Sequence, residues 1–212
     1  MELNDNDGRM VETMQRSRKL LKNIGGILLP ILIGVVVALL IRSTVFEFAR
    51  VDGPSMQPNL QDTERVAMLK LAPIHRNSVV IFDAQGEDPN ATSHINYVKR
   101  VVGLPGDEIS SRKGRLYVNG KQLSQAYIGM SQRTTGTGDW TLQSLGEDHE
   151  WAHPATRVPK DHYFVLGDHR SVSNDSRYWG FVDRNKIAGV VKVPFWTGDK
   201  VARHNINRLA QK

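Results

Sequence analysis

The sequence predicts a mostly-β domain that follows a single transmembrane helix. Two observations carry this prediction. Residues 24–41 form an uncharged run of 18 residues, and the rest of the 212-residue chain contains short apolar segments separated by Gly, Pro and Asn. Helical periodicity is scarce after residue 42, which favours strands over helices. A chain of this length suffices for one domain of ordinary size.

The apolar run has the length of a membrane anchor. About 20 apolar residues span a hydrocarbon core of roughly 30 Å, so residues 24–41 are just long enough. A cleaved signal peptide has a shorter apolar core followed by small residues at its cleavage site. Here the run ends at Arg42 without such residues. We therefore predict a retained anchor at residues 24–41, a preceding tail of residues 1–23 and a domain of residues 42–212.

Basic residues flank the anchor unevenly and predict its orientation. Four of them lie shortly before it: Arg16, Arg18, Lys19 and Lys22. The only nearby basic residues after it are Arg42 and Arg50. The positive-inside rule then keeps the tail in the cytoplasm. It places residues 42–212 on the extracytoplasmic (periplasmic) side of the cytoplasmic (inner) membrane, in a single-pass arrangement.

Composition excludes several classes of protein. The chain has no cysteine, so a disulfide scaffold, a thiolate zinc site and a Cys nucleophile are all excluded. The formal charge of +6 results from 28 basic and 22 acidic residues. Residues 43–212 hold 22 of the basic and 18 of the acidic residues without forming a basic block. The excess charge therefore indicates membrane topology and does not indicate a nucleic-acid partner.

Seven strands are expected along the domain, each a short apolar segment between turn signals. Their ranges are Val45–Val51, Arg65–Leu69, Ser78–Phe82, Ile95–Val102, Arg115–Val118, His162–Leu166 and Ile187–Val193. Asn119-Gly120 predicts a hairpin, because both residues accept positive φ. Residues 121–158, and above all 124–158, are polar and Gly/Thr-rich. We expect them to form an insertion outside the core.

The first segment that could carry chemistry surrounds Ser55. Gly53-Pro54 precede this serine, and Pro58 follows it closely. Glycine and proline restrict the backbone on both sides and would present the hydroxyl rigidly. The alternative is an ordinary turn in which Ser55 bonds to the backbone.

The second segment places a lysine in an apolar setting. Ile95, Tyr97, Lys99 and Val101 share one face of a predicted strand, whereas Arg100 lies on the other face. Lys99 either reaches out to solvent or is a buried amine with a depressed pKa. A general base requires the second arrangement. Lowering the pKa of lysine from ~10.4 to ~7–8 takes roughly 4 kcal/mol of desolvation.

The third segment, residues 166–182, is too polar for a strand and too aromatic for a linker. Asp168, Arg170, Asp175 and Arg177 could form ion pairs there and position the small hydroxyls between them. The alternative is a structured surface loop that is held by salt bridges and has no function. Dense loops next to strands often form the walls of a site.

Together these segments resemble the type I signal peptidase (leader peptidase) family, in its bacterial form with one N-terminal anchor. The resemblance extends over most of residues 16–193, with the boxes in the family's order. These boxes are Gly53-x-Ser55-Met56-x-Pro58, Tyr97-Val98-Lys99-Arg100 through Gly106-Asp107, and Gly167-Asp168-x-Arg170 with Asp175-Ser176-Arg177-x-x-Gly180.

The resemblance implies an all-β catalytic domain and a serine endopeptidase. Ser55 would be the nucleophile and Lys99 the general base of a Ser–Lys dyad. The substrates would be exported preproteins, cleaved after small residues at −3 and −1 at the surface of the lipid bilayer. The resemblance implies no metal and no organic cofactor.

Supporting roles follow from the same resemblance. Ser173 falls where the family has a serine that orients the lysine amine. Asp175 and Arg177 match a supporting ion pair, and Asp168 with Gly167 would shape the wall of the site. Some family members have a serine at the position of Gly53; here the oxyanion would accept from backbone N–H groups, chiefly that of Ser55. The expected substrate-binding residues are Val51, Met56, Tyr97 and Val98, in strands that would pair with the signal peptide.

A competing motif is the H-E-x-x-H pattern of zinc peptidases at residues 149–153. Both histidines must lie one turn apart on a helix, but Pro154 follows at once and disfavours helical geometry. No third ligand follows at a familiar spacing. We therefore expect a solvated loop there. A triad of Ser55, His169 and Asp168 is also disfavoured, because adjacent Asp and His side chains rarely align in this way.

Two other hypotheses for the function remain open at this point. The chain could be a non-enzymatic envelope protein that keeps the family's fold and only binds partners. A self-cleaving transcriptional repressor could share the Ser–Lys chemistry, although the anchor and the missing DNA-binding module disfavour it. Near the C-terminus, Phe195 and Trp196 either close the core or contact the bilayer interface, where Trp is favoured.

Overall fold

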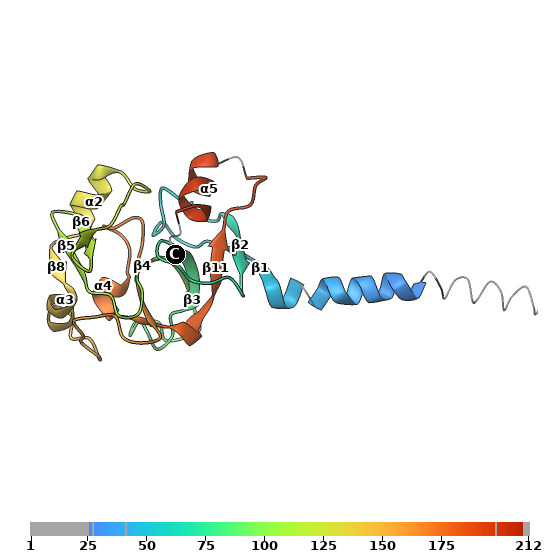
Figure 1. Cartoon of the computed structure of the whole chain (residues 1–212), viewed down its shortest axis with the longest axis horizontal. Helices are drawn as coiled ribbons and strands as arrows, with labels where there is room; N and C mark the ends of the chain where they lie inside the picture. The colour runs from blue at the N-terminus through green and yellow to red at the C-terminus, as the bar shows by residue number, and fades with distance from the viewer. Residues whose placement is uncertain (1–25, 27, 41, 198, 210–212) are drawn as a thin grey trace, which may run out of the picture. The chain divides into compact units, whose positions relative to one another are not determined.

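The computed structural model describes residues 26, 28–40, 42–197 and 199–209. The chain divides into two units, residues 1–44 and residues 45–212. An apolar helix leads up to the second unit, and its window Leu28–Val45 has 18 residues and a mean hydropathy of 2.4 (Figure 1). This helix is long and apolar enough to cross a membrane, and it continues beyond the predicted end of the anchor at residue 41. The predicted tail, with its basic residues, lies outside the described residues.

Seven strands form the larger sheet of the second unit. Its order is β1-β2-β11-β3-β4-β9-β10, and every neighbouring pair is antiparallel. The strands are β1 (Phe46–Arg50), β2 (Arg65–Leu69), β3 (Val79–Asp83), β4 (Asn96–Gly103), β9 (His162–Leu166), β10 (Val182–Asp183) and β11 (Ile187–Lys192). In β3 four successive residues are buried, as expected for a strand in the middle of a sheet.

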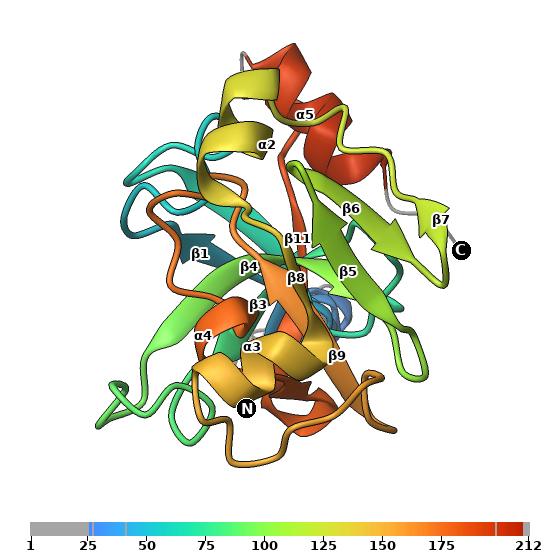
Figure 2. The same ribbon diagram turned by 90° about the vertical axis from the view of Figure 1, so that its left-hand side faces the viewer.

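The smaller sheet lies at the opposite end of this unit from β1 and β2 (Figure 1). Its order is β7-β6-β5-β8, with β5 (Ile109–Arg112), β6 (Arg115–Val118), β7 (Lys121–Gln122) and β8 (Trp140–Thr141). Figure 2 shows short helices near this sheet. The helices are α2 (Met130–Gly136), α3 (Leu142–Asp148), α4 (Ser176–Trp179), η1 (Arg184–Lys186) and α5 (Lys200–Asn207).

All seven predicted strands are present, with ends within one residue of the expected ones. The predicted hairpin joins β6 to β7, with φ of 50° at Asn119 and 77° at Gly120. Strands β5, β8 and β10 and the short helices were not predicted. In β5, for example, the buried face consists of Ile109 and Ser111, so a single large apolar residue provides too little alternation to reveal a strand.

The prediction that residues 121–158 lie outside the core is wrong. This segment contributes six large buried residues to a core shared with β5 and β9: Leu123, Trp140, Leu142, Leu145, Trp151 and Val158. Trp140 packs against Phe164 with ring centroids 5.6 Å apart. These six residues are irregularly spaced, so the segment has no period that would indicate burial. Helix α3 begins with a capping box between Thr141 and Ser144.

A second core cluster holds the predicted nucleophile segment against the sheet. Val51 and Met56, on either side of Ser55 in the sequence, are buried together with Val98, the residue before Lys99. Because interiors are close-packed, these side chains restrict both segments at once. The turn that carries Ser55 is thereby fixed to strand β4.

Candidate active site

Ser55 lies in the turn that follows β1. Gly53 adopts φ of 83°, a conformation that favours glycine, and its N–H donates to Asp62 Oδ1 at 2.8 Å. The Ser55 carbonyl accepts from the His169 N–H at 3.0 Å, which joins the turn to the loop after β9. Among the described residues, no acceptor is bonded to the Ser55 N–H. This donor is therefore available to a bound molecule.

Lys99 lies in the middle of β4 and points at the Ser55 turn. Its side chain is buried, with an exposed fraction of 4%. The amine Nζ is 3.0 Å from Ser55 Oγ and 3.2 Å from the Val98 carbonyl oxygen. The Tyr97 ring lies beside the amine, 5.0 Å from Nζ to the ring centroid. The predicted pairing of Ser55 with a buried Lys99 is confirmed as a contact.

Burial changes the acid–base chemistry of this amine. Removal from water lowers the pKa of Lys99 from 10.5 to about 8, against the opposing attraction of Asp175 and Asp88. An amine with this pKa is neutral in an appreciable fraction of molecules near pH 7.5. A neutral amine can accept a proton, which an ordinary lysine rarely does at this pH.

A buried ion pair supports the loop between β9 and α4. Arg177 Nε and Nη2 donate to the two carboxylate oxygens of Asp175 at 2.8 and 2.9 Å. Asp175 also accepts from the Gly167 N–H at 2.9 Å, and Arg177 donates to the carbonyl oxygens of Arg170 and Gly136. The predicted pair of Asp175 with Arg177 is confirmed, and it fixes both ends of the loop.

Asp168 has a different partner from the one expected. Its carboxylate accepts two bonds from Arg100, from Nε at 2.8 Å and from Nη2 at 2.7 Å, and both side chains are fully buried. Asn59 Nδ2 donates to the same carboxylate at 2.8 Å. Arg170 instead donates to Gln125, Thr137 and Tyr127. Asp168 therefore joins β4, the Ser55 turn and the loop, and its carboxylate is not engaged by His169.

The Ser173 hydroxyl forms no hydrogen bond with Lys99, the contact by which the resemblance would have it orient the amine. Its Oγ is buried without a hydrogen-bond partner in the part of the chain that the structure describes. The side chain packs against Gly167, where an added Cβ would lie 2.2 Å from Ser173 Oγ and 2.6 Å from the Ser55 carbonyl oxygen. Glycine at this position therefore lets the loop approach the Ser55 turn closely.

Two of the expected substrate-binding residues lie inside the protein. Val51 and Met56 are buried in the core, and the Val51 N–H and carbonyl are bonded to Glu64 and Thr63. Neither residue is open to a substrate, which corrects that expectation. The backbone of Val98, by contrast, lies at a part of the β4 edge that no described strand covers.

The Val101 N–H donates to Ser78 and the Val101 carbonyl accepts from Asn77, so both groups point toward the β3 side of β4. Because backbone groups alternate along a strand, the N–H and carbonyl of Val98 point to the opposite edge of β4. Strand β9 pairs with this edge only from Arg100 onward. Within the described ranges, no strand pairs with the edge beside Val98.

The H-E-x-x-H sequence lies just outside a helix, as expected. Helix α3 ends at Asp148, and Glu150 has φ of 50°, so His149 and His153 do not share a helical face. His149 packs against Tyr178 with ring centroids 5.1 Å apart. The described residues contain no group of three acidic or histidine side chains that could hold a metal ion.

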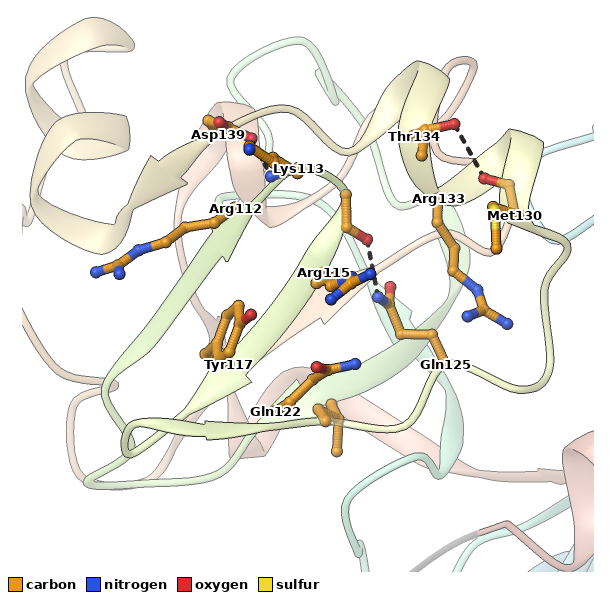
Figure 3. A pocket seen from close by; sticks show the side chains of 12 residues that line it. Arg112, Lys113, Arg115, Tyr117, Gln122, Gln125, Met130, Arg133, Thr134 and Asp139 are labelled. Atoms are coloured by element: carbon orange, nitrogen blue, oxygen red, sulfur yellow. Dashed lines mark hydrogen bonds between the residues drawn. The ribbon is translucent and has the colours of Figure 1, made fainter.

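A large basic cleft lies on the smaller sheet, apart from Ser55 and Lys99 (Figure 3). It has a volume of about 840 Å³, and its lining includes Arg112, Lys113, Arg115 and Arg133. In Figure 3 the Arg112 and Arg133 side chains point in different directions and do not converge on one position. Neither Ser55 nor Lys99 lines this cleft, so its size does not identify the site of the chemistry.

Sequence reasoning missed three residues of this site: Arg100, Asn59 and Asp88. Arg100 was placed on the correct face of β4 but without a partner. Asp88 accepts from the Tyr97 hydroxyl at 2.8 Å, and its burial in a loop was not foreseen. The available signal was chemical: a buried arginine beside Lys99 requires a carboxylate, and the loop after β9 supplies one.

Comparisons with known proteins relate this chain to one family. The family model described as "Signal peptidase, peptidase S26" matches residues 24–196. A signal peptidase IB of Staphylococcus aureus is 36% identical over 193 residues, which cover 85% of this chain and 95% of that protein. A signal peptidase I of Bacillus licheniformis is 34% identical over 178 residues, covering 82% and 89%. A solved signal peptidase I from Enterococcus faecalis has 35% identity and a TM-score of 0.47, covering 56% of this chain and 97% of that one.

Proposed function

Because this chain belongs to the signal peptidase family, peptidase S26, we propose that Ser55 and Lys99 are the nucleophile and the general base with which it cleaves signal peptides. Family membership supports the enzyme class. One observation supports the two residues: the buried amine of Lys99 lies 3.0 Å from Ser55 Oγ. This distance permits direct transfer of a proton.

In the proposed reaction, neutral Lys99 takes the proton of Ser55 as Oγ bonds to the scissile carbonyl carbon. The carbonyl oxygen becomes negatively charged and accepts from the Ser55 N–H. Lys99 then gives its proton to the leaving amine as the C–N bond breaks, which releases the mature protein and leaves an acyl-enzyme. Water attacks the ester while Lys99 takes its proton. That proton returns to Ser55 as the signal peptide leaves with a carboxylate.

The open edge of β4 is the proposed binding position of the substrate. An extended signal peptide would add a strand there and exchange hydrogen bonds with the backbone of Val98, directly beside Lys99. The family resemblance supports cleavage after small residues at −3 and −1. The substrates are then exported preproteins, presented as extended segments at the surface of the bilayer.

The proposed location is the cytoplasmic membrane, with the tail inside and the domain outside. The helix containing Leu28–Val45 supports the anchor. An exposed aromatic patch of Phe48, Phe195 and Trp196 supports a second contact with the bilayer interface. Trp196 packs against both phenylalanines, with centroids 6.3 Å from Phe48 and 5.0 Å from Phe195. An enzyme and a substrate held in one membrane meet at a raised effective concentration.

The test uses the full chain purified in detergent and a preprotein with an Ala-x-Ala site. We expect one cut after that site, and less than about 0.1% of this activity in Ser55→Ala and in Lys99→Ala, because each removes a member of the dyad. A chelator should leave the wild-type rate unchanged. A zinc peptidase would lose activity with the chelator and keep it in Ser55→Ala. A family member that only binds partners would show no cleavage at all.

A further inference from the structure

Asp88 is a buried carboxylate for which the proposed reaction has no role. It lies in the loop between β3 and β4, with an exposed fraction of 1%. Its Oδ1 accepts from the backbone and side-chain nitrogens of Asn90 at 2.9 and 3.2 Å, which fixes the carboxylate within its own loop. Its Oδ2 accepts from two side chains of other segments, Tyr97 and Asn174. A buried charge with this many donors is held in one orientation.

The first of these donors leads to the lysine. The Tyr97 hydroxyl donates to Asp88 Oδ2 at 2.8 Å, and the ring of the same tyrosine lies 5.0 Å from Lys99 Nζ. Burial, followed by the hydrogen bond to Asp88, raises the pKa of Tyr97, so its hydroxyl keeps the proton that it donates. Asp88 therefore fixes the ring that forms one wall of the space around the amine.

The second donor leads to the loop after β9. Asn174 Nδ2 donates to Asp88 Oδ2 at 2.6 Å, although the two residues are 86 positions apart in the sequence. Asn174 directly precedes Asp175, which accepts from the Gly167 N–H at 2.9 Å. Gly167 in turn packs against the Ser55 turn. Through Asn174, Asp88 is thus connected to the loop that supports the nucleophile.

We propose that Asp88 is a positioning residue for the Ser55–Lys99 dyad, holding Tyr97 beside the amine and Asn174 in the supporting loop. The inference rests on the proposed function. One carboxylate oxygen joins the β3–β4 loop, strand β4 and the loop before α4. No other side chain described by the structure bonds to both Tyr97 and Asn174.

The charge of Asp88 should also affect the pH dependence of the reaction, through the pKa of Lys99. Ser55 and the Tyr97 ring lie beside the Lys99 amine. The carboxylates of Asp175 and Asp88 raise the pKa of Lys99 against the larger effect of burial. A cleft of about 250 Å³ beside Asp88 is also lined by four titratable groups: Glu87, His149, Glu150 and Tyr178. Replacing Asp88 by a neutral residue removes one attraction for the ammonium. The pKa of Lys99 then falls further below 8, and the acid limb of kcat/KM moves to lower pH.

The experiment compares Asp88→Asn with Glu87→Gln, which removes a neighbouring charge in the same loop without touching Tyr97 or Asn174. We expect Asp88→Asn to lower kcat/KM by about tenfold at its optimum and to move the acid limb to lower pH. Glu87→Gln should leave both unchanged. Tyr97→Phe and Asn174→Ala each break one contact and keep the carboxylate. They should lower kcat while moving the limb less.

A double-mutant cycle separates positioning from general destabilisation. The double variant Asp88→Asn/Tyr97→Phe should have a kcat/KM little lower than that of the more severe single variant, because both substitutions remove the same hydrogen bond. Additive losses, or a pH profile for Asp88→Asn equal to that of the wild type, would overturn the inference. If Asp88→Asn does not fold, Tyr97→Phe and Asn174→Ala decide: wild-type kcat in both overturns it. Activity that survives Ser55→Ala would instead refute the proposed function.

Discussion

The amine of Lys99 lies 3.0 Å from the hydroxyl of Ser55, across 44 residues of sequence. The contact joins a central strand of the large sheet to a turn after its edge strand. This contact alone would not keep the two segments together. The shared core of Val51, Met56 and Val98 fixes their separation, and the loop after β9 closes against the same turn through the His169 N–H.

The pKa of Lys99 sets the expected pH dependence of cleavage. Below about pH 8 most of the folded molecules carry a protonated amine, which cannot accept the Ser55 proton. We therefore expect kcat/KM to rise about tenfold per pH unit on the acid side and to level off above about pH 8. Preprotein cleavage measured from pH 6 to 9.5, with thermal unfolding recorded at each pH, checks this. A plateau already reached at pH 6.5 would contradict the role of Lys99.

Burial of Lys99 should also cost stability. The amine has a pKa of 10.5 when exposed and of about 8 in the folded protein, a difference that corresponds to about 3 kcal/mol. Because the folded pKa is the lower one, the cost is complete below pH 8 and fades as the pH rises toward 10.5. Lys99→Met should therefore raise the free energy of unfolding by about 3 kcal/mol at pH 7, with a smaller gain at pH 10. Denaturant unfolding at both pH values measures it, and an equal gain at the two would argue against this cause.

Gly167 is expected to be intolerant of any side chain. A Cβ there would lie 2.2 Å from Ser173 Oγ and 2.6 Å from the Ser55 carbonyl oxygen, so the loop or the nucleophile turn must shift. We expect Gly167→Ala to lower kcat by about a hundredfold, because small displacements of reacting groups have effects of that size. Gly129→Ala is the matched control, since Gly129 has φ of −66° and an added Cβ meets nothing within 4 Å. Similar activity of the two variants would show that this approach has no functional role.

The buried pair of Arg100 and Asp168 should dominate the electrostatic contribution to stability. Asp168→Ala leaves the guanidinium of Arg100 buried without its carboxylate, and we expect a loss of about 3–5 kcal/mol. Glu108→Ala removes a partner from the exposed pair of Glu108 with Arg157 and should cost less than about 1 kcal/mol. Urea unfolding of both variants gives the comparison. A small loss for Asp168→Ala would mean that water reaches Arg100 in its place.

The sequence by itself determined the local features of this protein. Alternation placed Lys99 on the apolar face of its strand and Arg100 on the opposite face. Asn119-Gly120 determined a hairpin, and the uncharged run determined a helix long enough to cross a membrane. The order of the boxes identified the family's chemistry. Each of these signals depends on neighbouring residues, whose spacing reflects strand and helix geometry directly.

Only the tertiary structure decided which distant residues meet. Asp168 pairs with Arg100 and not with Arg170, the Ser173 hydroxyl has no hydrogen-bond partner among the described residues, and residues 121–158 complete a core. Asp88 and Asn174 meet across 86 residues. Such contacts depend on how the loops close over the sheet. A buried charge can be satisfied by any suitable group brought within about 3 Å, and no local period in the sequence records which group that is.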